Sequence, residues 1–67
     1  MNEQVLNKVI ELRKAKRITQ EKFAGKIGVT RQTIIAIEKG NYTPSVALAI
    51  KIAKFFNRKV EDIFSTE

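Results

Sequence analysis

Residues 19–40, TQEKFAGKIGVTRQTIIAIEKG, constrain the fold more than any other part of the chain. Thr19 and Thr30 each stand in front of a short apolar pattern of helical spacing, and threonine is a favoured residue at the N-cap of a helix. Gly28 follows the first of these patterns, at the place where helices often end with a residue in the left-handed conformation. The segment therefore predicts two short helices joined by a tight turn.

The two helices, expected over 20–27 and about 31–39, must cross closely at Ala24, because a larger side chain there would push them apart. Gly25 lies within the first helix and costs up to about 1 kcal/mol relative to alanine, so this helix depends on packing. A tight turn and a close crossing are typical of a helix-turn-helix motif, whose second helix enters the major groove of DNA. The angle between the helices is filled by Ile27, Val29, Ile34 and Ile37.

Helical spacing also runs through the flanking residues. It predicts a first helix over about 2–16, a fourth over 46–57 and a short last turn over 60–64. No stretch alternates in the manner of a strand, so the expected fold class is all-α, with five short helices in one compact domain. The apolar stripe expected on the fourth helix consists of Val46, Ala49, Ile52, Ala53 and Phe56.

Cysteine and histidine are both absent from the 67 residues, which removes the usual thiolate and imidazole metal ligands and the commonest general base. The seven carboxylates are scattered, and no serine or threonine has an activating base in view. We therefore expect that the protein is not an enzyme and that it binds neither a metal nor a cofactor. No apolar run approaches the roughly 20 residues of a bilayer span, and no signal peptide is evident, so we expect a cytoplasmic protein.

The net charge of +6 is concentrated in one stretch of the chain. Residues 8–39 carry nine basic and three acidic residues, whereas the remaining residues carry four of each. A basic surface of this kind favours a polyanionic partner, with nucleic acid ahead of a membrane. The alternative is a basic, well-solvated surface without a specific partner.

The segment ITQEKFAGKIGVTRQTIIAIEKGNYTPS resembles the Cro/cI-type (Xre family) helix-turn-helix transcriptional regulators of bacteria, phages and some archaea. ELRKAKRITQ before it and ALAIKIAKFFNRKVEDIF after it match the same family. The resemblance implies that residues 1–67 form one five-helix lambda-repressor-like domain, with the helix-turn-helix motif at about 19–39. It also implies a regulator, expected to be a repressor, that binds double-stranded DNA at a palindromic operator as a homodimer. No small-molecule ligand is expected.

The resemblance also implies roles for individual residues. Two groups of positions match the family's DNA contacts, one facing bases and one facing phosphates. The base-facing positions are Arg31, Gln32, Ile35 and Ala36. The phosphate-facing positions are Thr19, Gln20, Thr30, Thr33, Lys39, Asn41 and Tyr42, and Gln20 is also placed to buttress the third helix.

The chemistry of these side chains agrees with base recognition. Arg31 can pair bidentately with the O6 and N7 atoms of guanine, and Gln32 with the N6 and N7 atoms of adenine, each pair giving about 1–3 kcal/mol of discrimination. Ile35 fits a thymine methyl group, the apolar feature of the major groove. The alternative for Ile35 is an exposed apolar residue without a role, since single residues of this kind are common on surfaces.

Arg13 and Glu38 both fall on apolar, core-facing stripes, where opposite charges are better placed together than alone. The family resemblance implies a structural ion pair between these residues, which would tie the first helix to the third. The alternative is two separate, solvent-facing charges.

Other features of the sequence leave alternatives open. Ile50 and Phe55 lie off the main stripe of the fourth helix, where they either widen the core or form a dimer face. At the level of function, the alternatives are the antitoxin of a toxin–antitoxin pair and a protein–protein adaptor that uses the same fold. The intact TRQ sequence and the localised charge favour DNA binding over the adaptor.

Overall fold

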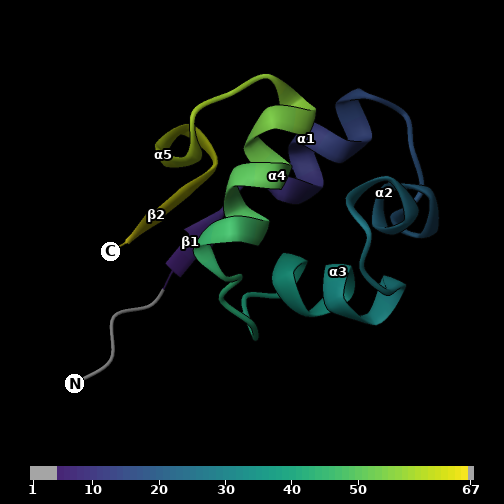
Figure 1. Ribbon diagram of the computed structural model, residues 1–67, viewed down its shortest axis with the longest axis horizontal. Helices are drawn as coiled ribbons and strands as arrows, with labels where there is room; N and C mark the ends of the chain where they lie inside the picture. Colours follow the sequence, from purple (N-terminus) through teal and green to yellow (C-terminus); the bar gives the residue numbers. More distant parts are fainter. Residues whose placement is uncertain (1–4, 67) are drawn as a thin grey trace.

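The computed structural model describes residues 5–66, and this part of the chain contains five helices and two short strands (Figure 1). Each helix forms where the sequence predicts one, which confirms a mainly helical, five-helix fold. Within the described residues, no helix has both the length and the apolar character needed to cross a bilayer. In chain order the elements are β1 (Val5–Asn7), α1 (Val9–Ala15), α2 (Gln20–Ile27), α3 (Arg31–Glu38), α4 (Val46–Phe56), α5 (Val60–Ile63) and β2 (Phe64–Thr66).

The predicted caps Thr19 and Thr30 are confirmed, and Ser45 caps α4 in the same way. The side-chain oxygens of Thr19, Thr30 and Ser45 each accept a hydrogen bond from the backbone N–H three residues later, at 3.0, 3.2 and 3.1 Å respectively. Gly28 ends α2 in the left-handed conformation, with φ at 87°, and its N–H donates to the carbonyl of Ala24 across 2.8 Å. The turn of the motif is therefore fixed by local hydrogen bonds at both of its ends.

The prediction of one helix over about 2–16 is wrong at its N-terminal end. α1 begins at Val9, and Val5–Asn7 form β1 instead. Asn7 gives the physical reason, because its Oδ1 accepts from the N–H of Val9 at 3.0 Å while its Nδ2 donates to the carbonyl of Ile37 at 2.9 Å. A short amide side chain that binds nearby backbone competes with the helical ladder. Residues 2–4 of the predicted helix lie outside the described residues.

The expectation that the chain contains no strand is also wrong. β1 and β2 pair as an antiparallel two-stranded sheet, in which Val5 lies opposite Thr66 and Asn7 lies opposite Phe64. Phe64 therefore begins a strand, whereas the sequence pattern predicts that it continues the last helix. The two strands lie beside α5, on the side of α4 opposite α2 (Figure 1).

The core lies where α1, α2, α3, α4 and α5 meet. Phe55 extends it, since its ring centroid lies 5.3 Å from that of Phe23 and 5.1 Å from that of Phe56. The prediction that Val46 belongs to the core is wrong: it is 77% exposed, because the helical spacing continues through the first turn of α4 while the core does not. The buried apolar residues are Val9, Phe23, Ala24, Ile27, Ile34, Ile37, Ala49, Ile52, Ala53, Phe56 and Ile63.

Candidate nucleic-acid interface

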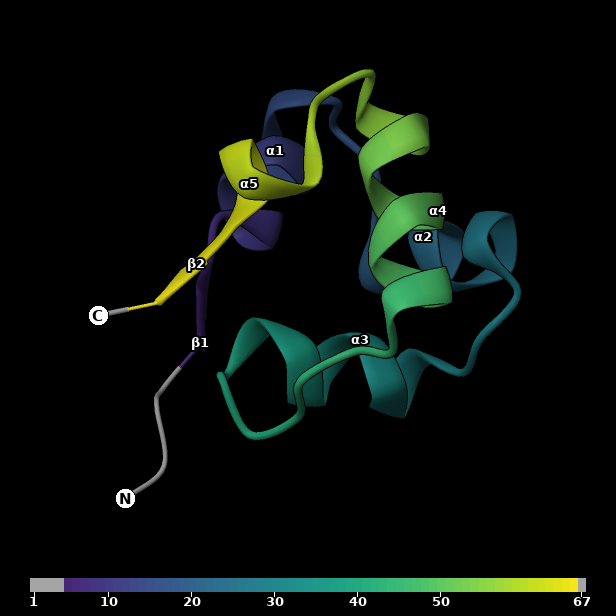
Figure 2. The ribbon, with the colours of Figure 1, turned by 60° about the vertical axis from the view of Figure 1, so that its left-hand side comes forward.

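α3 is held with one face in the core and the other directed outward. Ile34 and Ile37 are fully buried, and Ala24 of the partner helix α2, where the sequence predicts a close crossing, is only 3% exposed. Helical periodicity then places Arg31 and Gln32 on the outward side, and both are exposed. α3 lies across one end of the molecule, below the N-terminal end of α4 in the view of Figure 2. Its outward edge is therefore exposed at Arg31 and Gln32 and half-buried at Ile35 and Ala36.

A buried ion pair ties α3 to α1. Arg13 Nε donates to Glu38 Oε2 at 2.7 Å, and Arg13 Nη2 donates to Glu38 Oε1 at 3.3 Å, so the guanidinium makes a two-pronged contact. The two side chains are only 11% and 4% exposed, respectively. Arg13 Nη1 also donates to the carbonyl of Ile18 at 2.9 Å, in the connection that leads into α2. One arginine thus joins α1, the connection that leads into α2, and α3.

Gln20 continues this network to the surface. Its Nε2 donates to Glu38 Oε1 at 2.9 Å, and its Oε1 accepts from Arg31 Nε at 3.4 Å. The amide therefore lies between a buried carboxylate and an exposed guanidinium. Arg31 is held towards α2 by this contact, which reduces the number of positions that its side chain can take.

Most of the residues predicted to contact DNA lie in two shallow hollows. Arg31 shares the first hollow with Thr19 and Gln20, so the start of α2 and the start of α3 are adjacent there. In the second hollow, α3 meets the loop that follows it. Its lining residues are Thr30, Gln32, Thr33, Ala36 and Tyr42.

Three predicted residues lie outside both hollows. Ile35 is half-buried, Lys39 is the exposed C-cap residue of α3, and Asn41 is exposed with its backbone N–H donating to the carbonyl of Ala36 at 2.9 Å. Lys39 and Asn41 therefore extend the basic and polar surface past the C-terminal end of α3. Ile35 is less exposed than expected for a residue on the outer side of the helix.

The N-cap hydroxyl of Thr19 can donate a hydrogen bond to a phosphate. Its oxygen accepts from the N–H of Lys22 at 3.0 Å, which leaves the hydroxyl proton free to donate to another acceptor. The exposed N-terminal turn of α2 also presents backbone N–H groups and the positive end of the helix dipole. An anion next to Thr19 would meet both.

Sequence reasoning did not find one residue that positions α3. Asn7, through its donation to the carbonyl of Ile37, holds the C-terminal end of α3 against β1. The only signal in the sequence was an asparagine directly before an apolar helical pattern. That signal identifies a possible cap, but it does not show that the other end of the amide reaches a helix thirty residues away.

Comparisons with known proteins support this geometry. A helix-turn-helix family model matches residues 9–63. The chain is 61% identical over 61 residues to the HTH-type transcriptional regulator MJ0272 of Methanocaldococcus jannaschii, covering 91% of this chain and 92% of that protein. It is 34% identical over 59 residues to the cryptic phage CTXphi transcriptional repressor RstR of Vibrio cholerae, covering 88% of this chain and 53% of RstR.

Among solved structures, the restriction-modification controller protein C.AhdI from Aeromonas hydrophila is similar, with a TM-score of 0.72 and 28% identity. The similarity covers 81% of this chain and 78% of that one. The fold, the exposed edge of α3 and these relatives lead to one conclusion. The chain belongs to the Xre (Cro/cI-type) helix-turn-helix family and is a DNA-binding transcriptional regulator.

Proposed function

We propose that the protein represses transcription by binding a palindromic operator as a homodimer, with α3 of each copy in the major groove. The observation that carries this proposal is the outward edge of α3, which is braced from behind by the network of Arg13, Glu38 and Gln20. The similarity to RstR, itself a transcriptional repressor, supports repression as the outcome of binding. Residues 1–67 act as a single domain, and the protein acts in the cytoplasm on double-stranded DNA.

Base recognition is assigned to four residues of α3. Arg31 and Gln32 are exposed at the N-terminal end of the helix, where side chains of a recognition helix reach base edges. Arg31 pairs with guanine and Gln32 with adenine. Ile35 and Ala36 follow on the same edge, and Ile35 contacts a thymine methyl group.

Phosphate contacts flank this edge on both sides. Thr19 and Gln20 at the start of α2 hold one strand of the backbone. Thr30 and Thr33, which line the second hollow, and the residues at the C-terminal side of α3 hold the other strand. The residues assigned there are Lys39, Asn41 and Tyr42.

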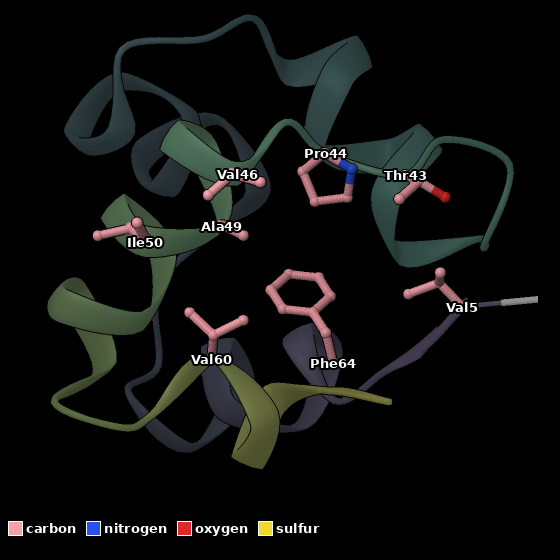
Figure 3. Close-up of a pocket in the computed structure, with 8 residues that line it drawn as sticks. All are labelled: Val5, Thr43, Pro44, Val46, Ala49, Ile50, Val60 and Phe64. Atoms are coloured by element: carbon pink, nitrogen blue, oxygen red, sulfur yellow. The ribbon is translucent and has the colours of Figure 1, made fainter. Parts of the chain in front are cut away.

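An apolar groove of about 150 Å³ is the surface that we assign to the homodimer (Figure 3). It lies between the start of α4 and the unit formed by α5 and the two strands. Val46 and Ile50 of α4 are 77% and 42% exposed beside it, and Phe64 faces them from β2. Because an isologous interface uses the same patch on both copies, the exposed valine and isoleucine of one copy can fill the groove of the other.

The charge distribution favours the same face. Each copy carries +6, and this excess comes from residues 8–39, while the remaining residues are neutral in sum. Val46, Ile50 and Phe64 all belong to the neutral part. Two copies that meet through this face keep their basic stretches apart and avoid the repulsion that another approach would create.

Selection of bound duplexes from a random pool tests the proposal. The enriched sequences should contain an inverted repeat, with half-site centres separated by about one helical turn of DNA, roughly 34 Å, or a multiple of it. Binding of the enriched duplex should fall steeply as salt rises, since each neutralised phosphate releases counterions. No enrichment, or enrichment of a single asymmetric site, would count against an operator-binding dimer.

A further inference from the structure

A second concentration of positive charge lies away from the outward edge of α3. Lys26 of α2 and Lys51 and Lys54 of α4 line one hollow together with Phe55 and Gly25, and we call this the basic hollow. Lys16, which follows α1, places its Nζ 5.5 Å from the centroid of the Phe55 ring. Three lysines therefore line one hollow together with an aromatic ring, and a fourth lysine lies over that ring.

None of these lysines is neutralised by residues 5–66. The ion pair between Arg13 and Glu38 is the one salt bridge within that part of the chain, so no carboxylate of those residues lies within 4.0 Å of the four ammonium groups. Lys51 has a local role, because its Nζ reaches the carbonyl of Ile27 at the end of α2 at 3.5 Å. Lys26 and Lys54 are exposed and make no side-chain hydrogen bond within residues 5–66. The basic hollow is therefore suited to an anionic partner.

Gly25 leaves room for a partner in the basic hollow. A Cβ atom built on Gly25 would meet nothing within 4 Å, so packing does not require a glycine at this position of α2. Alanine would stabilise the helix by up to about 1 kcal/mol relative to glycine. The fold thus bears an unfavourable residue whose effect is to leave the floor of the basic hollow open.

Phe55 and the position of the hollow indicate which class of anion fits. The half-buried ring provides an apolar surface among the lysines, which suits an anionic partner that carries an apolar side chain between its charges. Lys51, at the middle of α4, lies beside Ile27 at the end of α2, just before the turn to α3, whereas Lys54 lies in the last turn of α4, at the end of this helix that points away from α3 (Figure 2). A partner docked there leaves the outward edge of α3 free for DNA.

We propose that the basic hollow binds an acidic segment of a partner protein, whose carboxylates face the lysines and whose apolar side chain covers Phe55. The regulator would then hold this segment while α3 is bound to DNA. The basic hollow shares no lining residue with the apolar groove assigned to the homodimer.

The test uses the full chain and a fluorescent synthetic peptide in which one phenylalanine is flanked by glutamates. A second peptide has glutamine in place of every glutamate. Fluorescence anisotropy should show tighter binding of the glutamate peptide, with and without a saturating DNA duplex. Combining Lys26→Gln with Lys54→Gln should weaken that binding about tenfold, as expected for the loss of two ion pairs.

Two controls separate this surface from general charge effects and from folding. Combining Lys8→Gln with Lys14→Gln removes the same charge elsewhere and should change peptide binding less than about twofold. Gly25→Gln should raise the melting temperature while it weakens peptide binding, because the new side chain fills the hollow. Equal binding of the two peptides would overturn the proposal. So would a loss of duplex affinity in the Lys26→Gln, Lys54→Gln variant as large as its loss of peptide affinity, since the hollow would then belong to the DNA surface.

Discussion

Gln20 Nε2 donates to Glu38 Oε1 across 2.9 Å, and this one bond connects the outward edge of α3 to the buried ion pair behind it. Glu38 also accepts two hydrogen bonds from Arg13, which fix the position of the carboxylate that Gln20 contacts. Gln20 is thereby oriented with its carbonyl oxygen towards Arg31. The contacts run from the core outward, which is the order needed to hold Arg31, the side chain that we propose reads a base, in place.

Gln20→Ala should weaken operator binding about tenfold. Arg31 loses its hydrogen bond to Gln20, and Thr19 loses a neighbour that we propose faces the DNA backbone. The loss of stability should be about 1 kcal/mol, since Glu38 keeps its bonds to Arg13. A double-mutant cycle with Arg31→Ala, measured by fluorescence anisotropy on the selected duplex, separates the two effects. If Gln20 acts through Arg31, its removal costs little in the variant that already lacks the arginine. Fully additive losses would show that Gln20 contacts DNA independently.

Glu38→Ala should lower the free energy of unfolding by about 3–5 kcal/mol, because it leaves the buried guanidinium of Arg13 without its carboxylate. Urea denaturation followed by circular dichroism measures this change. Glu38→Gln keeps the shape and one acceptor oxygen, so it should cost less. An unchanged melting temperature in the alanine variant would show that the pair contributes nothing to stability.

Much of the fold could be predicted because it is encoded locally. Thr19, Thr30 and Ser45 each cap a helix within three residues of their own position, and Gly28 ends α2 by its own conformational freedom. Such signals do not depend on the rest of the chain. The ion pair between Arg13 and Glu38 could also be predicted, because both charges fall on apolar stripes that must face the same core.

Features that depend on distant parts of the chain could not be predicted. β1 forms because it pairs with β2, which lies at the far end of the sequence. The local spacing of Val5 and Val9 fits a helix equally well, so the strand could not be recognised from nearby residues. The exposure of Val46 depends on where the core ends, which periodicity does not report. The basic hollow combines Lys26 and Lys54 from separate helices, so no continuous stretch of sequence contains it.

Ile35→Ser should weaken binding selectively, at operators that carry thymine at the facing position. The expected loss is about fivefold, since the contact of one apolar group with a methyl group contributes roughly 1 kcal/mol. Competition between matched duplexes, one with thymine and one with cytosine at that position, measures the selectivity. The thymine preference should disappear in the variant. A uniform loss on both duplexes would assign Ile35 to packing, in keeping with its half-buried position.

Ile50→Glu should abolish the homodimer, because it places a charge in the apolar groove that two copies are proposed to share. The fold should persist, since Ile50 is 42% exposed. Sedimentation velocity should then give a monomer at concentrations where the unmodified protein is a dimer. Binding to the inverted repeat should weaken at the same time, while binding to a single half-site should not.

The matched control for this substitution is Ala47→Glu, which adds the same charge to an exposed position of α4 that does not line the groove. It should leave the dimer intact. If both variants remain dimeric, the groove beside Val46 and Phe64 is not the interface, and the copies must meet through another face. If both become monomeric, the added negative charge on α4 and not the apolar groove controls association. A monomeric Ile50→Glu variant together with a dimeric Ala47→Glu variant is the one result that assigns the interface to the groove, because the two substitutions add the same charge at different positions.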